Sequence, residues 1–344
     1  MSAGDAEVPH VLFVALYSGD SFCSALERTA QHLQIGYVSP LRVHALVNKA
    51  VARMPSWITQ HELSRMPADA QAQHRNLSHG KPKSASIYLW KAFLYRVIPV
   101  AKLIVLDLDV VLVSSATMHG LWAHFERFES RQVLGIVPEQ GPTYARLKLK
   151  GLNGGVQLHH LERMRTRAGF RLTSSESGNR DSTLFTSADT MDGSSFDAIL
   201  RRCASGGCAG WDKVEPSLGD QTLYSYVCHH ESDLCRSLPC GWNRQMSTRF
   251  YTAQDFTSKW HVCTSGCSLL HFNQPLLEAL VPSLQKGNRQ PSCNECRLAL
   301  IELKNRTRAS GSHNPKFKWG TSKQYMAQHI ESCCCSREHE GELN

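Results

Sequence analysis

Two carboxylates lie within an apolar run, LIVLDLDVVLV at residues 103–113, and carboxylates at this spacing can bind a metal ion. Burying an ionised carboxylate is costly unless a cation or hydrogen bonds stabilise it. Because side chains alternate along a strand, Asp107 and Asp109 should share one face and repel each other. A divalent ion between them would remove the repulsion and could also hold a diphosphate. The alternative is a strand that ends in a polar turn with both carboxylates in water, and the short D-x-D pattern alone favours it.

An apolar strand followed by D-x-D-x-V is also the first motif of haloacid-dehalogenase-type phosphatases, in which the first aspartate is a nucleophile. That class usually places the motif near the start of the chain and needs an acidic pair later on. Here a long segment precedes Asp107, and LGDQTLYS at residues 218–225 does not supply the acidic motif. The phosphatase is therefore a minor alternative.

The segments around the motif predict an α/β domain. The first strand, helix and strand form a β-α-β unit, which predicts a parallel sheet with a right-handed crossover. In such a sheet, ligand sites lie outside the carboxyl ends of the strands. Apolar runs predict strands at 9–17, 41–48, 101–113 and 132–138, and helical spacing predicts helices at 21–33, 84–99, 121–128 and 220–230. Residues 151–165 are expected to form a Gly-marked turn, a strand and a helix, and residues 269–273 the end of a strand.

The chain divides into three expected parts. Residues 1–8 are a disordered N-terminus, and 9–308 form one domain. Within it, 172–210 is rich in Ser, Gly, Thr and Asp, which predicts a loop insertion or a disordered segment. Residues 309–344 form a polar tail that contains cysteines, with one possible short helix near its end.

Composition is that of a soluble globular protein, with 42% apolar and 20% charged residues and a net charge of +8. The positive charge suits an anionic ligand or surface, but ordinary solubility is the preferred explanation. No Lys/Arg block with interleaved aromatic residues occurs, so nucleic acid is not an expected partner. No apolar run is long enough to span a membrane.

The cysteines are concentrated in the second part of the chain: of the thirteen, only Cys23 precedes residue 203. We expect disulfides there, with a zinc site as the alternative. That zinc site would use Cys263, Cys267, Cys293 and Cys296. The CCC at 333–335 is expected in a disordered tail, with palmitoylation as a lesser alternative. Disulfides favour the secretory pathway, and two N-x-S/T sequons, at Asn76 and Asn305, agree with it but add little because such sequons often arise by chance.

The N-terminus MSAGDAEVPH has neither the basic nor the apolar region of a signal peptide. The chain is therefore expected to be either cytosolic or a fragment that has lost a leader or membrane anchor. The cysteine content favours the second interpretation.

Five motifs occur in an order that resembles glycosyltransferase family 8. They are IVLDLDVVLV, GLNGGVQL, LGDQTLYSYV, SLPCGWNRQMS and LLHFN. The resemblance runs from about residue 9 to about residue 300, and it is greatest to the xylosyltransferase-type domain of LARGE-like enzymes. It implies a GT-A fold, which is a Rossmann-like, mostly parallel sheet flanked by helices. It further implies Mn²⁺, a UDP-sugar donor, retention of anomeric configuration, and a glycan or glycoprotein acceptor in the Golgi lumen or secretory pathway. Xylose is the sugar expected first, and glucose next.

The resemblance also implies roles for single residues. Asp107, Asp109 and His271 match the metal ligands, and carboxylate and imidazole together suit Mn²⁺. Asp220 and Gln221 match a pair that touches the transferring sugar and are the expected catalytic residues. The residues expected to bind the donor are Tyr17 (stacking on uracil), Lys91 (phosphates and sugar), Asp107 (ribose), Asn153 (sugar), and Gly154 and Gly155 (close backbone approach).

One departure from the family pattern follows His271. Family members usually carry a lysine a few positions later that holds the diphosphate, but HFNQPLLEAL at 271–280 has none. Arg244 or Lys286 would have to replace it. The departure favours the alternative of a catalytically weak or inactive member that acts as a sugar- or nucleotide-binding module.

Overall fold

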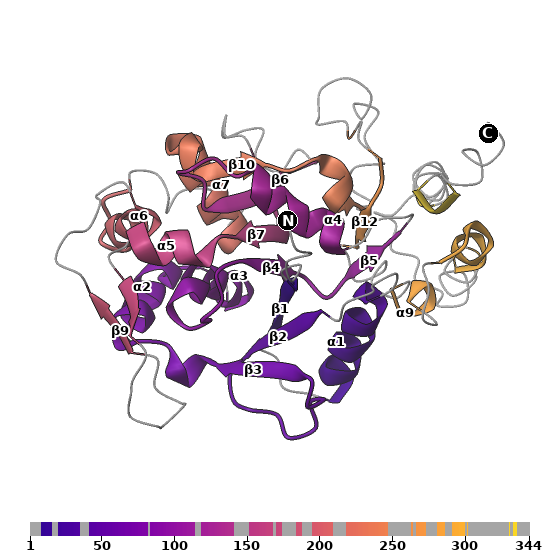
Figure 1. Cartoon of the computed structure of the whole chain (residues 1–344), viewed down its shortest axis with the longest axis horizontal. Coiled ribbons are helices and arrows are strands. Elements are labelled where there is room, and N and C mark those ends of the chain that lie inside the picture. The colour runs from indigo at the N-terminus through magenta and orange to yellow at the C-terminus, as the bar shows by residue number, and fades with distance from the viewer. Residues whose placement is uncertain are drawn as a thin grey trace, which may run out of the picture.

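The structure is a computed structural model of the 344-residue chain, shown in Figure 1. It describes residues 8–15, 20–34, 41–81, 83–113, 118–140, 151–167, 170–173, 184–187, 195–208, 218–246, 263, 266–272, 281–285, 291–299, 301, 330 and 333–335. Among these residues, no helix is both long and apolar enough to cross a membrane.

A seven-stranded sheet forms the centre of the molecule, in the order β10-β6-β7-β4-β1-β2-β3. Its strands are β1 (His10–Ala15), β2 (Arg42–Val47), β3 (Ile58–Glu62), β4 (Leu103–Leu106), β6 (Leu134–Pro138), β7 (Leu152–His159) and β10 (Cys235–Ser237). All neighbouring pairs are parallel except those of β7, which is antiparallel to β4 and β6. The predicted mixed, mostly parallel sheet is confirmed.

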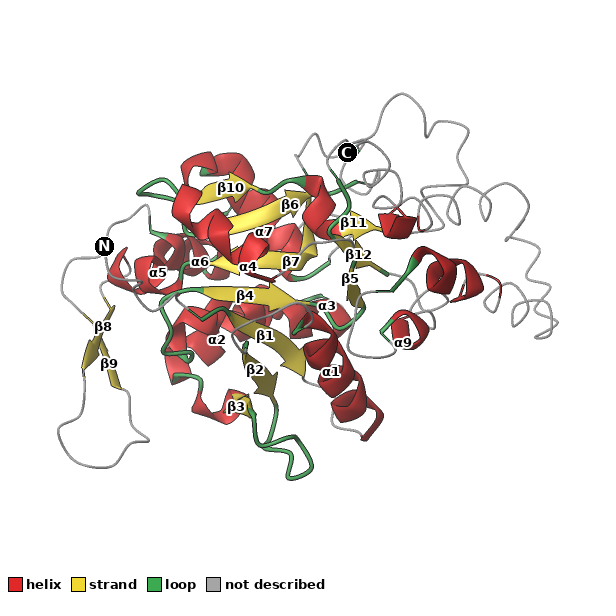
Figure 2. Cartoon of the chain, turned by 45° about the vertical axis from the view of Figure 1, so that its right-hand side comes forward, coloured by secondary structure: helices red, strands yellow, loops and turns green. Residues whose placement is uncertain are grey.

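Helices cover both faces of this sheet, as Figure 2 shows. They are α1 (Asp20–Leu33), α2 (Ala68–Ser78), α3 (Lys83–Tyr88), η2 (Leu89–Arg96), α4 (Met118–Trp122), η3 (Ala123–Arg127), α5 (Leu161–Arg167), α6 (Phe196–Ala204) and α7 (Asp220–His230). The short helix α9 (Val281–Leu284) lies outside this sheet and packs in a separate apolar core with Val111 and Leu270. Side chains along β1 point alternately to the two faces of the sheet and so belong to two apolar cores. Leu12 packs in the core under η2 and α7, whereas Phe13 packs in the other core with Leu26 of α1. Two further short turns of 3-10 helix are η6 (Ser232–Leu234) and η7 (Cys240–Asn243).

The predicted strand 101–113 is interrupted at the two aspartates. Strand β4 ends at Leu106, residues 107–109 turn, and β5 (Val110–Leu112) leaves the central sheet. There it pairs antiparallel with β12 (Leu269–His271), which pairs with β11 (Arg244–Gln245). The expectation that strand alternation places Asp107 and Asp109 on one face was therefore wrong. The turn brings them together instead, while the apolar residues on either side fill two different sheets.

Two expectations about loops also need correction. Within 172–210, residues 196–204 form helix α6, whose apolar residues Phe196, Ile199 and Leu200 are buried at helical spacing. Residues 170–173, which overlap the start of this segment, pair with residues 184–187 inside it as strands β8 (Phe170–Thr173) and β9 (Leu184–Ser187). Gly154 and Gly155 lie within strand β7 and not in a turn, and Gly151 directly precedes that strand. Helix 84–99 is present as α3 and η2, which ends at Arg96.

Six disulfides confirm the preferred reading of the cysteines over zinc. They are Cys203–Cys208, Cys228–Cys235, Cys240–Cys263, Cys267–Cys333, Cys293–Cys335 and Cys296–Cys334. The CCC at 333–335 is therefore not a free tail, because each of its cysteines is bonded to the 267–296 region. Those bonds bury Cys333 and Cys334 in a third apolar core, which includes Phe272 beside the metal-ligand candidate.

Candidate active site

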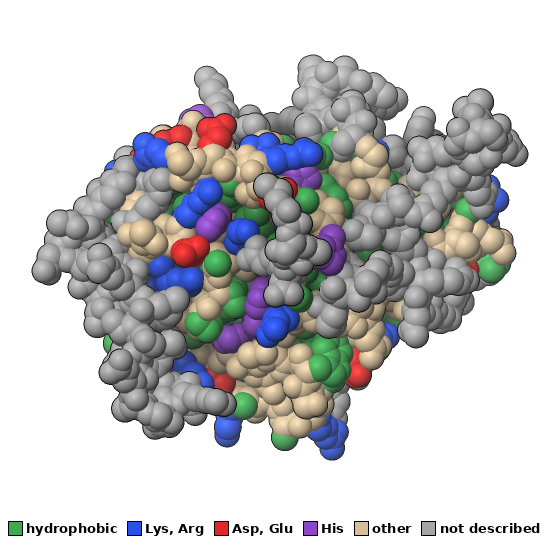
Figure 3. Space-filling view, in the orientation of Figure 1, with side chains coloured by type: hydrophobic (Ala, Val, Ile, Leu, Met, Phe, Trp, Pro, Cys, Tyr) green, Lys and Arg blue, Asp and Glu red, His purple; other side chains and the backbone are tan. Residues whose placement is uncertain are grey.

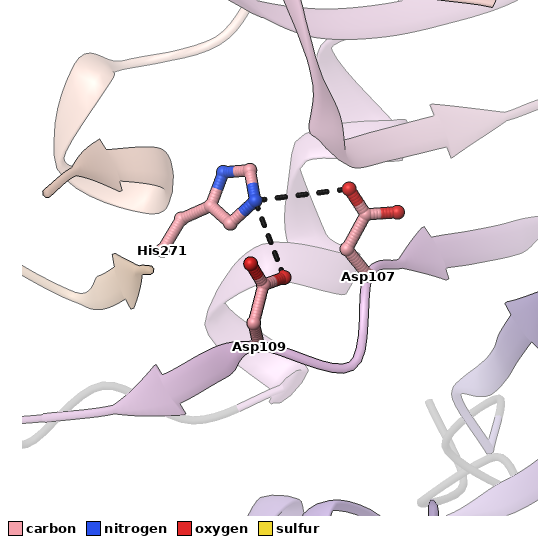
Figure 4. Close-up of side chains that lie close together, drawn as sticks. All are labelled: Asp107, Asp109 and His271. Atoms are coloured by element: carbon pink, nitrogen blue, oxygen red, sulfur yellow. Dashed lines mark ion pairs between the residues drawn. The ribbon is translucent and has the colours of Figure 1, made fainter. Parts of the chain in front are cut away.

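Three predicted metal ligands converge from two sheets, as Figure 4 shows. His271 Nε2 lies 3.3 Å from Asp109 Oδ1 and 3.7 Å from Asp107 Oδ2. One ligand atom of each residue lies within 4.8 Å of the others. Both carboxylates are partly exposed and the histidine is buried. Two carboxylate oxygens and one imidazole nitrogen form a donor set that suits Mn²⁺, so the residues fit the implied metal.

Backbone pairing sets the positions of these ligands. The Asp107 N–H donates to Gly155 O at 3.0 Å, and the Phe272 N–H donates to Asp109 O at 2.9 Å. His271 pairs with Val110 in the β12–β5 register. The imidazole ring packs on Gly155, where a Cβ atom would lie only 2.2 Å from the ring. The sequence-based role of Gly155 was close approach to a donor, and in the structure its missing side chain makes room for His271.

The two carboxylates make the site favourable for a cation. Burial of the ring lowers the pKa of His271, but Asp109 and Asp107 outweigh burial, and the pKa is raised above its usual value. A proton on His271 is thus stabilised by the same negative charges that would hold a metal ion. Positive charge on His271 can therefore stabilise both aspartates at the end of this apolar strand, and Lys91 adds a second cation beside Asp107.

Lys91 joins the metal-ligand cluster to the predicted catalytic aspartate. Its Nζ donates to Asp107 Oδ1 at 2.8 Å and to Gly154 O at 3.0 Å, and it lies 3.4 Å from Asp220 Oδ2. The side chain is 1% exposed. Burial lowers the pKa of Lys91, but attraction to Asp107 and Asp220 outweighs burial and the pKa is raised. Lys91 is therefore a buried cation that orients two carboxylates, and its expected contact with donor phosphates stays a prediction.

Asp220 is the first residue of α7 and is 2% exposed. Burial raises its pKa to about 6, although Lys91 lowers it and Asp107 raises it further. Gln157 Nε2 donates to Asp220 Oδ2 at 2.5 Å. Helix α7 can begin here because the preceding Gly219 has a φ of +66°, and a Cβ there would meet Ala85 O at 2.3 Å.

Gln221 and Asn153 meet at a carboxylate that the sequence reasoning missed. Glu139 Oε2 accepts from Gln221 Nε2 at 2.8 Å and from Asn153 Nδ2 at 3.1 Å. The Gly154 N–H donates to Gln221 Oε1 at 3.3 Å. Glu139 follows strand β6, and its position after an apolar strand is the same signal that identified Asp107. Asn243, also missed, accepts from His271 and lies within the GWN of the motif SLPCGWNRQMS.

The structure thus brings together nine of the ten predicted site residues: Lys91, Asp107, Asp109, Asn153, Gly154, Gly155, Asp220, Gln221 and His271. Tyr17 and Lys286 lie outside the described residues. Arg244 donates to Cys263 O at 2.7 Å. On the described part of the face shown in Figure 3, Lys and Arg side chains are dispersed and form no single basic patch.

Comparison with known proteins gives distant relatives. No protein-family model matches the chain. Xylosyl- and glucuronyltransferase LARGE2s of Danio rerio is 25% identical over 255 residues, and LARGE2 of Homo sapiens is 27% identical over 256 residues. Each alignment covers 69% of this chain, but only 29% and 30% of the respective relative. The chain thus spans less than a third of the length of these relatives.

Two solved structures share the fold. Mouse xyloside xylosyltransferase 1, in its apo form, superposes with a TM-score of 0.57 at 18% identity and covers 78% of this chain and 98% of that chain. The galactosyltransferase LgtC in complex with donor and acceptor sugar analogues has a TM-score of 0.50 at 13% identity and covers 78% and 88%. The sheet order and the sequence relatives agree with this fold. The chain is therefore distantly related to the LARGE xylosyl- and glucuronyltransferases and has a GT-A-like fold.

Proposed function

We propose that the chain transfers a sugar from a UDP-sugar to a glycan or glycoprotein acceptor, with Mn²⁺ as cofactor and retention of anomeric configuration. The observation that carries the proposal is the convergence of Asp107, Asp109 and His271, with Lys91 linking Asp107 to Asp220. A metal-ligand set alone is common on protein surfaces. A buried lysine that ties it to a catalytic carboxylate indicates a site built around a charged substrate.

Asp107, Asp109 and His271 would hold the metal, which when bound supplies a Lewis acid for the diphosphate leaving group. Asp107 lies at the junction, since one of its oxygens faces His271 and the other accepts from Lys91. We assign it a second contact to the donor ribose. Asn153 and the backbone of Gly154 lie on the Asp220 side and are assigned to the sugar.

Asp220 and Gln221 are the proposed catalytic pair. Sugar transfer with retention passes through an oxocarbenium-like transition state, which nearby carboxylate and carbonyl dipoles stabilise. Asp220 is held by Gln157 and Lys91, and Gln221 by Glu139, so both have fixed orientations before substrate enters. Burial raises the pKa of Asp220 to about 6. This value is still below neutral pH, so the carboxylate form predominates at pH 7. The acceptor hydroxyl would enter on the face from which UDP leaves.

Xylose is the proposed sugar, with glucose next. The relatives named above include xylosyltransferases, and the chain shares a fold with a xyloside xylosyltransferase. We place the protein in the Golgi lumen or secretory pathway, where its six disulfides would be stable.

The test is release of UDP from a panel of UDP-sugars, with Mn²⁺ and with EDTA, by wild type and Asp109→Asn. Mn²⁺-dependent release from one donor, lost in the variant, supports transfer and identifies the sugar. The alternative is a catalytically weak or inactive binding module, favoured by the absence of a lysine in residues 272–280. Binding of UDP with no release from any donor, also with acceptor glycans present, would favour that module.

A further inference from the structure

A continuous row of hydrogen bonds connects the metal-ligand histidine to the catalytic glutamine through buried side chains. His271 Nδ1 contacts Asn243 Oδ1 at 2.9 Å, and Asn243 Nδ2 contacts Asn153 Oδ1 at 2.8 Å. Asn153 Nδ2 contacts Glu139 Oε2, which also accepts from Gln221. Asn243 is 0% exposed and Asn153 is 2% exposed, so water does not compete for these contacts.

The direction of each hydrogen bond in this row is fixed by a backbone group. The Gly155 N–H can only donate, and it points at Asn153 Oδ1 at 3.0 Å. The oxygen of the Asn153 amide therefore faces Gly155 and Asn243, and its nitrogen faces Glu139. Asn243 must then direct its NH₂ group at Asn153 and its oxygen at His271. A ring nitrogen that faces a carbonyl oxygen must carry the proton.

We infer that Asn243 is a positioning residue that holds His271 in the Nδ1–H tautomer, so that the Nε2 lone pair faces Asp107 and Asp109. Nε2 is the ring atom 3.3 Å from Asp109 and 3.7 Å from Asp107, where a metal ion would bind. A ligand histidine needs this lone pair, and the partner of its other nitrogen selects the tautomer. The backbone of Asn243 is itself held by Gln140, whose Nε2 donates to the Asn243 main-chain carbonyl oxygen at 2.6 Å.

The inference deepens the proposed function, since it concerns the same metal site, but its first test needs neither metal nor turnover. Full-length protein with ¹⁵N-labelled histidine, free of metal and at alkaline pH where the rings are neutral, gives a tautomer-specific NMR pattern for each ring. The peak that disappears in His271→Gln belongs to His271. We expect the Nδ1–H pattern in wild type and its loss in Asn243→Ala. An Nε2–H pattern for wild-type His271 would overturn the inference.

Mn²⁺ binding, followed by the electron paramagnetic resonance signal of free Mn²⁺, is the second test. Asn243→Ala should weaken binding about 10- to 100-fold, the usual effect of removing a partner of a ligand histidine. Asn243→Asp keeps an acceptor for the ring N–H but loses the donor to Asn153 Oδ1, so it should bind Mn²⁺ more tightly than Asn243→Ala and less tightly than wild type. Gln245→Met is the matched control, because Gln245 is buried two residues away and outside the row. Equal loss in Asn243→Ala and Gln245→Met would refute a specific role. A wild type with the expected tautomer but no Mn²⁺ binding would instead refute the metal in the proposed function.

Discussion

Replacing Gly155 by alanine should displace His271 and disable the metal site. The added Cβ would lie 2.2 Å from Cε1 and 2.4 Å from Nδ1 of the ring, whereas ordinary contact begins at 3.4 Å. The ring must therefore move by about 1 Å, because 3.4 minus 2.2 is 1.2 Å. The backbone of Gly155 cannot move instead, since its carbonyl accepts from Asp107 and its N–H donates to Asn153. Overpacking of this kind costs about 1–3 kcal/mol.

In Gly155→Ala, the affinity for Mn²⁺ should fall by more than the loss of folding stability accounts for. A ring moved by that distance loses its contact with Asn243 and leaves Asp107 and Asp109 as the only ligands. The assay is Mn²⁺ titration with the thermal unfolding midpoint measured on the same samples without metal. Two glycine variants serve as controls. Gly135 lies in the neighbouring strand β6, and a Cβ atom there would be 2.8 Å from Phe128. A Cβ atom at Gly154 would be 3.0 Å from Asp220.

We expect Gly135→Ala to lower the midpoint while Mn²⁺ affinity is kept, and Gly154→Ala to reduce turnover more than Mn²⁺ affinity. In Gly155→Ala, Mn²⁺ affinity should fall at least about tenfold, as for lost support of a ligand histidine. Wild-type Mn²⁺ affinity in Gly155→Ala would refute the placement of His271 against β7, and with it the argument that this glycine is required by the ligand ring.

Three further predictions concern stability. Lys91→Met should lower the free energy of unfolding by about 3–5 kcal/mol in urea at pH 7, because it leaves Asp107 and Asp220 without their buried cation. Lys91→Met combined with Asp220→Asn should recover part of the loss. Burial lowers the pKa of His32 to about 4 and that of His159 to about 3, so the unfolded chain binds more protons below pH 6.5. The contribution of these histidines to the free energy of unfolding should be complete above pH 6.5 and should fall by up to about 3 kcal/mol per histidine as the pH drops to 4. The fall should be shallower in His32→Gln. A free energy of unfolding that does not change over this pH range would contradict the burial of these rings. Serine at all three of 333–335 should lower the thermal midpoint and make residues 267–296 sensitive to protease, whereas Cys23→Ser, which breaks no disulfide, should not.

Local patterns predicted the elements whose cause is local. Strands β1, β2 and β6 and helix α1 follow from apolar spacing. The cluster of Asp107, Asp109 and His271 was predicted from the five ordered motifs, since the D-x-D pattern alone favoured a polar turn. Helix α6 was missed although its signal was present. Ser195 caps it by accepting from the Ala198 N–H, and the Ser- and Gly-rich surroundings concealed its apolar spacing.

The remaining misses depend on partners that are distant in the chain. The turn at Asp107–Asp109 separates β4 from β5 because β12, more than 150 residues later, pairs with β5. The CCC looked like a tail because cysteine spacing does not determine disulfide connectivity. Glu139 and Asn243 carry no motif of their own, since a single carboxylate or amide gains its role only from the groups it faces.

The charges of the site also explain why the lysine missing after His271 matters. Asp107, Asp109 and Asp220 bring three negative charges, and Lys91 brings one positive charge, so two negative charges remain. A divalent ion balances them when His271 is neutral, which is the state that the Nδ1–H tautomer provides. A UDP-sugar would then add the negative charges of its diphosphate, for which the site residues described here leave no further free cation. At low salt, UDP should therefore bind more tightly to Asn273→Lys than to wild type.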